Sequence, residues 1–117
     1  MRIRTKRVYD PPARSDGTRV LIDRLWPRGL SKAKARVDYW AKSIAVSHEL
    51  RRWYQHDPAK WDEFRRRYFG ELDANPEGVR ELRDRVGTRT ATLLFGSKED
   101  QRNNATALRE YLEALRE

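Results

Sequence analysis

Two short apolar segments limit the folds that are open to this chain. Residues 18–25 include the run Val20–Ile22, and residues 90–95 read Thr-Ala-Thr-Leu-Leu-Phe. Continuous apolar runs of this length are typical of strands that are buried on both faces of a sheet. The sequence between them has helical patterns, and strands joined by helical crossovers are parallel. We therefore predict an α/β fold with a short, mainly parallel sheet flanked by several helices.

The rest of the chain supplies an edge strand and the helices. Residues 2–8 predict an edge strand whose basic side chains protect it from pairing with other chains. Ser31 can cap a helix that we expect over residues 33–45, where apolar residues recur at helical spacing. Ser47 can cap a short second helix. With 117 residues the chain forms one domain, residues 1–117.

Capping signals place the later helices. Asp57-Pro58 predicts the start of a helix over residues 58–73, and Asn75-Pro76 repeats the signal for the next one. Ser97 and Asp100 resemble a capping box at the start of the last helix. That helix is expected to run to the end of the chain with these residues on its inner face: Ala105, Leu108, Leu112 and Leu115.

Composition excludes several kinds of site. The chain has no cysteine and only two histidines, which excludes disulfides, cysteine-bound zinc and any site built from three histidines. We predict no metal and no cofactor. No apolar run is long enough to cross a bilayer, and the N-terminus lacks the apolar stretch of a signal peptide. These features predict a cytoplasmic protein with no membrane partner.

The net charge of +8 lies entirely in the first third of the chain. Residues 1–36 hold 11 Lys or Arg and 3 Asp or Glu, whereas residues 37–117 hold 15 of each sign. Such asymmetry favours an anionic partner for the first third. The alternative is a basic surface that serves only solubility.

The loops that follow the two apolar strands are the predicted site. In a parallel sheet they leave the same edge, so residues 26–32 and 96–104 should be neighbours where α/β proteins bind ligands. Four cations flank these loops and can hold an anion at the starts of helices. They are Arg24, Arg28, Lys32 and Lys98. For Arg24 the alternative is an ion pair with an acid such as Asp23.

Four further residues complete the candidate site. Trp26 lies in the first loop, where its ring can cover a ligand. Asn103 and Asn104 have poor helix propensity, which suggests a hydrogen bond to the other loop or a ligand contact. His56 is the candidate catalytic residue, as a proton carrier, if there is catalysis. We assign its neighbour Asp57 to helix capping.

One pattern superficially resembles a DNA-binding helix-turn-helix. Two helices are joined by residues 55–58 and followed by the run Arg65–Arg67. The second helix, however, carries four basic and four acidic residues, whereas a recognition helix that approaches phosphates is positive. We interpret the arginine run as a solvated, internally paired face.

The residues together resemble a known family. Arg24-Leu25-Trp26-Pro27-Arg28-Gly29 is the most distinctive motif. Glu49-Leu50-Arg51, His56-Asp57-Pro58 and Asn103-Asn104-Ala105 continue the pattern through nearly the whole chain. They resemble the YeaO-like proteins of domain-of-unknown-function family 488. The resemblance implies a small bacterial α/β protein and no particular activity. Relatives commonly have a histidine where this chain has Arg102, so the resemblance supplies no catalytic imidazole there.

Three functional hypotheses remain open from the sequence. The first is binding, with or without turnover, of a small phosphorylated or otherwise anionic ligand held by Arg28 and Lys98 at the loop edge of the sheet. The second is a nucleic-acid-binding module that uses the basic first third. The third is an adaptor that binds an acidic protein. Steep salt dependence over many phosphates would favour nucleic acid. The sequence does not determine the oligomeric state.

Overall fold

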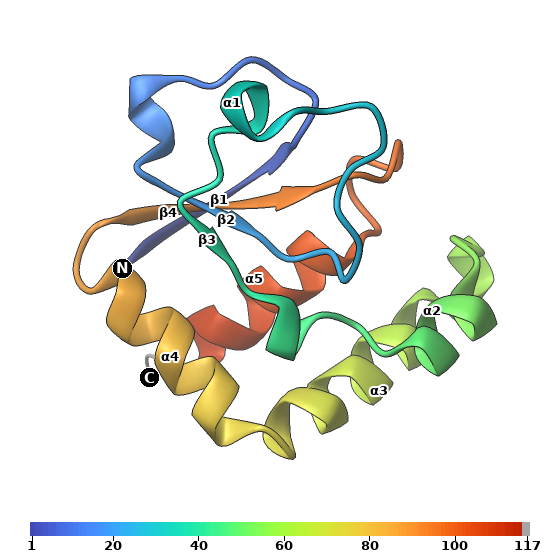
Figure 1. The fold of residues 1–117 in the computed structure, drawn as a ribbon. Helices are drawn as coiled ribbons and strands as arrows, with labels where there is room; N and C mark the ends of the chain where they lie inside the picture. Colours follow the sequence, from blue (N-terminus) through green and yellow to red (C-terminus); the bar gives the residue numbers. More distant parts are fainter. Residues whose placement is uncertain (116–117) are drawn as a thin grey trace.

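A computed structural model describes residues 1–115 of the chain (Figure 1). Its strands are β1 (Arg2–Arg7), β2 (Thr18–Leu21), β3 (Tyr39–Trp40) and β4 (Thr90–Phe95). Its α-helices are α1 (Lys32–Ala35), α2 (His48–Tyr54), α3 (Trp61–Asp73), α4 (Pro76–Val86) and α5 (Asn104–Ala114). Three short 3₁₀ turns cover Arg14–Asp16, Lys42–Ile44 and Pro58–Lys60.

The four strands form one sheet in the order β1-β4-β2-β3, and each neighbouring pair is parallel. The two strands expected from the apolar runs are therefore adjacent, with Val20 opposite Leu93. β1 lies at the edge, as its basic side chains predict. β2 is shorter than expected, because the chain leaves the sheet after Ile22, whose N–H still donates to the Leu94 carbonyl at 3.1 Å. These findings confirm the α/β fold.

The two faces of the sheet bury unequal cores. Alternate residues of β2 point to opposite faces, so Val20 packs into the larger core and Leu21 into the smaller one. The larger core is covered by α3, α4 and α5, on the side of the sheet opposite α1 (Figure 1). The smaller one lies under α1 and includes Trp26 and Trp40. α2 and α3 extend beyond the carboxyl ends of the strands (Figure 1).

The prediction of one helix over residues 33–45 is wrong. α1 ends after one turn, because Arg36 adopts a left-handed backbone with φ of 47°. The chain then enters β3, and just before it the Asp38 N–H donates to the Arg19 carbonyl at 2.8 Å. Trp40 packs into the smaller core and Ala41 into the larger one, so the apolar residues serve two faces. A short helix followed by a short strand has produced a spacing that resembles one helix.

The start of the last helix is also different from the expectation. Asn103 is its cap, because its side-chain oxygen accepts from the Thr106 N–H at 3.0 Å. Ser97 instead accepts from the Glu99 N–H, which closes a local turn rather than a capping box. The inner face is confirmed for three residues, but Leu115 is 41% exposed. The predicted continuation through residues 116–117 lies outside the described residues.

Asp57 has the capping role that the sequence predicts. Its carboxylate accepts from the Ala59 N–H at 3.0 Å, and Pro58 occupies the first helical position. The 3₁₀ turn that follows continues into α3.

We therefore expect Asp57→Ala to lower the free energy of unfolding by about 1 kcal/mol, and Asp57→Ser to restore most of it. Urea unfolding measures both effects. An alanine variant as stable as the wild type would show that this hydrogen bond contributes nothing to the start of α3.

Candidate functional site

The loops after β2 and β4 meet at the carboxyl edge of the sheet, as the parallel topology predicts. Asp23 joins them, because its Oδ2 accepts from the Gly96 N–H at 2.8 Å. Its Oδ1 accepts from Asn104 Nδ2, also at 2.8 Å. The Asp23 carbonyl accepts from Trp40 Nε1 at 2.7 Å, which ties β3 to the same point. One residue therefore contacts segments that are far apart in the sequence.

The Asp23 carboxyl group is held in an unfavourable setting for a charge. Burial raises its pKa above the ordinary value, although several neighbours oppose this shift. The opposing groups are the hydrogen bonds from Asn104 and Gly96 and the positive charges of Arg51 and His56. Gly96 favours the close approach, because a Cβ at this position would lie 3.0 Å from Asp23 Oδ2, and the carboxyl group would have to shift.

A cavity of about 250 Å³ opens beside Asp23. Its floor is the strand end, and α2 and α3 supply its walls. The lining residues are Asp23, Arg24, Val46, Arg51, Tyr54, His56, Phe64, Ser97 and Asn104. It combines one carboxylate, two arginines and a histidine with an aromatic wall, so it can bind both polar and apolar parts of a small molecule.

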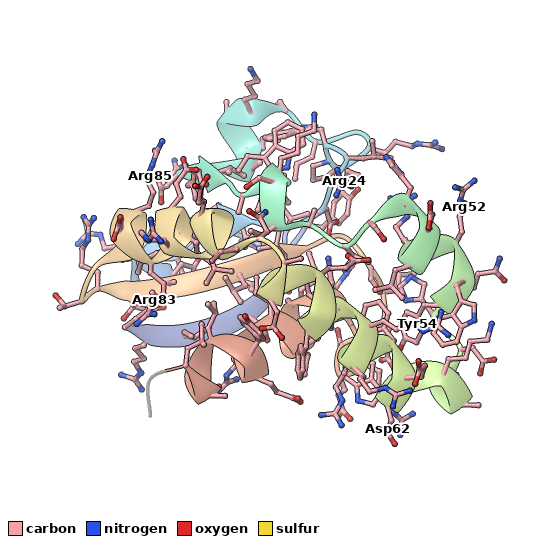
Figure 2. The ribbon with its side chains drawn as sticks, turned by 90° about the horizontal axis from the view of Figure 1, so that it is seen from below. Arg24, Arg52, Tyr54, Asp62, Arg83 and Arg85 are labelled. Carbon is pink, nitrogen blue, oxygen red and sulfur yellow. The ribbon has the colours of Figure 1, made fainter. Side chains whose placement is uncertain are left out.

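The aromatic wall is fixed by contacts on both sides. The rings of Tyr54 and Phe64 stack with centroids 4.2 Å apart. The Tyr54 hydroxyl donates to the Arg102 carbonyl at 2.8 Å, which connects α2 to the loop before α5. Burial raises the pKa of Tyr54 to about 12, so the hydroxyl stays protonated at neutral pH. Figure 2 shows Tyr54 among the side chains between α2 and α3.

The start of α2 is anchored by Ser47. Its hydroxyl oxygen accepts from the Leu50 N–H at 3.1 Å and caps the helix. The same hydroxyl donates to Glu71 Oε2 at 2.6 Å, and the Ser47 N–H donates to Glu71 Oε1 at 3.0 Å. Because Glu71 lies on α3, these bonds hold the start of α2 against α3.

Arg24 lines the cavity, but the prediction that it forms an ion pair with an acid such as Asp23 is wrong for residues 1–115. Its Nε donates to the Val46 carbonyl and its Nη2 to the Ala45 carbonyl, each at 3.2 Å. Arg24 therefore connects the strand end to the segment before α2, and its side chain lies between them (Figure 2). Its Nη1 makes no hydrogen bond within residues 1–115.

His56 reaches the cavity through an unusual backbone. Gln55 and His56 both have positive φ, 46° and 56°, which ends α2 and turns the chain back. The imidazole is exposed and lies 5.7 Å from the Tyr54 ring, measured between centroids. It makes no side-chain hydrogen bond in the described part of the chain, so no partner orients it as a general base.

Of the residues predicted for the site, Arg24, His56 and Asn104 line the cavity. Trp26 packs edge-on against Trp40 and donates from Nε1 to the Leu30 carbonyl at 2.6 Å. Asn103 is buried as a helix cap. The remaining three, Arg28, Lys32 and Lys98, are exposed and lie outside the cavity lining.

Sequence analysis missed Asp23, Arg51 and the aromatic wall as parts of the site. Asp23 had a usable signal, because it is a carboxylate directly after a buried strand and at the ligand-binding edge. The signal for Arg51 was weaker, since this residue is far in the sequence from both loops. Only the packing of α2 brings Arg51 to the cavity.

Much of the basic first third contacts the protein itself. Asp16 is buried and accepts from Arg19 Nη1 at 2.6 Å and from Lys6 Nζ at 3.2 Å. Burial raises the pKa of Asp16, but the hydrogen bonds from Ala13, Lys6 and Arg19 outweigh it and leave the pKa below its ordinary value. Arg19 also donates to the carbonyl of Ala35 and so fixes the end of α1. These cations serve the fold.

The arginine run on α3 is internally paired, as predicted. Arg65 contacts Glu110 on α5 at 2.6 Å as well as Asp62 at 3.2 Å. Arg66 and Arg67 both contact Glu63. Their charges are thus largely neutralised on the surface of α3.

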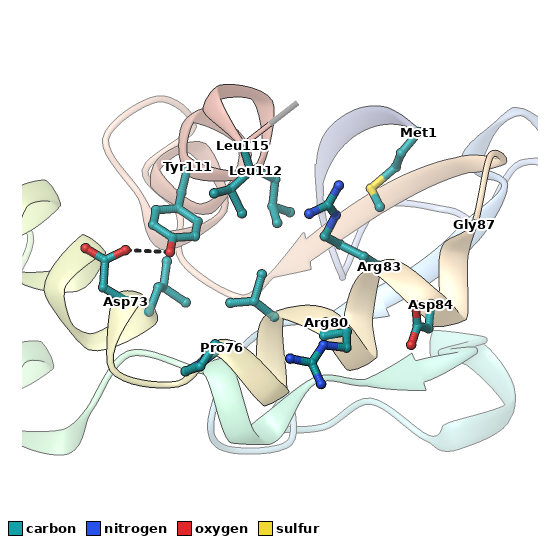
Figure 3. Close-up of a pocket in the computed structure, with 12 residues that line it drawn as sticks. Met1, Asp73, Pro76, Arg80, Arg83, Asp84, Gly87, Tyr111, Leu112 and Leu115 are labelled. Atoms are coloured by element: carbon teal, nitrogen blue, oxygen red, sulfur yellow. Dashed lines mark hydrogen bonds between the residues drawn. The ribbon is translucent and has the colours of Figure 1, made fainter. Parts of the chain in front are cut away.

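A larger groove of about 840 Å³ lies at the opposite edge of the sheet (Figure 3). It runs between α4 and α5, with Arg80 and Arg83 among its lining residues. One end is closed by the Tyr111 hydroxyl, which donates to Asp73 Oδ1 at 2.6 Å. This edge carries the amino ends of β1 and β4, away from the loops that bind ligands in parallel sheets.

Residues 1–115 contain neither a candidate metal site nor a candidate membrane-spanning helix. They contain no group of three or more His, Cys, Asp or Glu side chains placed to hold a metal ion. None of their helices combines the length and the apolar character needed to span a membrane.

Fold and site together define a small single-sheet α/β protein with a mixed-charge cavity at the carboxyl edge of its strands. Residues 2–117 match the family described as "Inactive DUF488-N3 subclade". The chain therefore belongs to the DUF488 family, domain of unknown function 488.

Its relatives are of similar length. It is 39% identical to the uncharacterized protein YeaO of Escherichia coli over 98% of this chain and 100% of that protein. It is 40% identical to the uncharacterized protein Rv3073c of Mycobacterium tuberculosis, over 95% of this chain and 93% of that protein. No solved structure matches the chain.

The raised pKa of Asp23 has a consequence for stability. A group with a raised pKa in the folded state stabilises the fold most below its unfolded-state value, ordinarily 3.8, and loses that contribution as pH rises. Relative to Asp23→Asn, the wild type should therefore lose free energy of unfolding as pH rises from about 4 toward neutrality. Urea unfolding of both proteins across this range measures the difference. A difference that is constant, or that grows in favour of the wild type, would contradict the raised pKa.

Proposed function

We propose that this protein binds a small molecule carrying an anionic group in the cavity beside Asp23, and that it does so without turning the ligand over. The observation that carries the proposal is Arg51. Its guanidinium lines the cavity but pairs with no carboxylate in residues 1–115. Arg24 lines the same cavity, and its Nη1 makes no hydrogen bond to the residues that the structure describes. A planar guanidinium at the mouth of a cavity is a strong partner for carboxylate or phosphate.

Three observations support binding rather than catalysis. The family that the chain matches carries the description "inactive". The one histidine at the cavity is exposed and has no orienting partner among the described residues, whereas a general base needs a defined position. Both oxygens of Asp23 accept hydrogen bonds that fix the loops, which gives this carboxyl group a structural task.

The anion site proposed here differs from the one expected from the sequence. The sequence predicts that Arg28 and Lys98 hold the anion, but both are exposed and outside the cavity lining. Arg51 takes their place, with His56 beside it. Both the predicted and the proposed site lie at the carboxyl edge of the sheet, but different basic residues hold the anion.

A thermal-shift screen tests this proposal. Inorganic phosphate, 4-methylpentanoate, 3-phenylpropanoate and the L-amino acids are suitable probes. At 100 times its Kd a ligand stabilises the folded state by about 2.7 kcal/mol, which is a rise of several degrees in Tm for a domain of this size. We expect at least one probe to raise Tm in this way and Arg51→Ala to remove most of the rise.

Arg52→Ala is the matched control. Arg52 is adjacent to Arg51 on α2, but its side chain points outward from the helix (Figure 2), and it is not in the cavity lining. Arg52→Ala should therefore keep the wild-type response. If no probe raises the Tm of the wild type more than that of Arg51→Ala, the proposed function is wrong.

A further inference from the structure

The cavity beside Asp23 presents opposite charges at two depths. The carboxyl group of Asp23 lies at the end of β2 and is partly buried, whereas Arg51 and His56 are exposed residues of the same lining. The positive charges are near enough to lower the pKa of Asp23 against the effect of burial. A ligand that extends from the mouth to the floor therefore meets a cation first and a carboxyl group last.

The Asp23 carboxylate at the floor of the cavity can accept more hydrogen bonds than the protein donates to it. A carboxylate can accept about four hydrogen bonds, and each Asp23 oxygen accepts one from the protein. The guanidinium of Arg24, which also lines the cavity, already donates from Nε and Nη2 to backbone carbonyls. The remaining acceptor positions of Asp23 are thus available to N–H groups of a ligand, and most strongly to positively charged ones.

The size and the walls of the cavity limit the rest of the ligand. A volume of about 250 Å³ is below the range of roughly 300–1,000 Å³ that is usual for drug-sized ligands. This favours a molecule of amino-acid size over a nucleotide. Val46, Tyr54 and Phe64 supply an apolar side to the lining, which suits a hydrocarbon or aromatic substituent.

We propose that the ligand is an amino acid or a zwitterion of similar size, with its ammonium group on Asp23 and its carboxylate on Arg51. Its apolar side chain then lies against Val46, Tyr54 and Phe64. This inference rests on the proposed function and names the ligand class for that site. An ammonium group also compensates the partly buried carboxylate of Asp23, which forms no ion pair within residues 1–115.

Calorimetry on the wild-type protein tests the two charges of the ligand separately. L-phenylalanine and L-leucine are the zwitterionic probes. 3-Phenylpropanoate lacks the ammonium group of phenylalanine, and phenethylamine lacks its carboxylate. We expect each truncated molecule to bind at least about tenfold more weakly than L-phenylalanine, because each loses charge-assisted hydrogen bonds. This comparison needs no variant and does not depend on the folding of one.

Variants then assign each charge to its partner. Arg51→Ala should weaken L-phenylalanine and 3-phenylpropanoate by about tenfold or more and leave phenethylamine almost unchanged. Asp23→Asn should weaken L-phenylalanine and phenethylamine by a larger factor than 3-phenylpropanoate, which has no ammonium group to lose its partner. Arg52→Ala should change none of the three.

The outcomes separate the two proposals. If 3-phenylpropanoate binds as tightly as L-phenylalanine and still needs Arg51, the zwitterion is excluded and the proposed function stands. If phenethylamine binds as tightly as L-phenylalanine, the anionic group is dispensable and both proposals fail. If inorganic phosphate alone binds and needs Arg51, the zwitterion is excluded and the proposed function stands. If neither phosphate nor any of the acids and amino acids binds, both proposals are overturned.

Discussion

The site depends on one carboxyl group, that of Asp23, which connects the loops that leave the two central strands. It accepts from the Gly96 N–H and from Asn104 Nδ2, and its own carbonyl accepts from Trp40 Nε1. These bonds position the loop after β4, the start of α5 and the end of β3 around one point. The cavity exists because α2 then closes over this point through Tyr54, whose hydroxyl donates to the Arg102 carbonyl.

The position of the Asp23 carboxyl group has an energetic cost. Burial raises the pKa of Asp23, so its ionised form weakens the fold at neutral pH. A carboxyl group with a purely structural task does not need to line a cavity or to face Arg51 and His56. The combination fits the proposed ligand, which has a positive and a negative end. Under that proposal, the ammonium group of the ligand would supply a counter-charge to Asp23 and offset the cost.

Much of the fold follows from local sequence patterns, whereas most of the site does not. The parallel pairing of β2 and β4 and the capping by Asp57 follow from apolar runs and Asp-Pro chemistry. The helix predicted over residues 33–45 is wrong, because a one-turn helix followed by a two-residue strand gives the same apolar spacing as one longer helix. Arg24, His56 and Asn104 are predicted from their positions near strand and helix ends, and all three line the cavity. Arg51 could not be found in this way, because only the packing of α2 over the sheet edge brings it to Asp23.

Carbon-13 NMR tests most directly whether Asp23 is a partly buried carboxyl group with a raised pKa and a free position for a positively charged ligand group. The chemical shift of the Asp23 side-chain carboxyl carbon, followed against pH, gives its pKa in the folded protein. We predict a midpoint above the ordinary value of 3.8 in the free protein, and a lower midpoint when L-phenylalanine is bound. A midpoint at or below 3.8 in the free protein, or one that saturating L-phenylalanine leaves unchanged, would contradict this account.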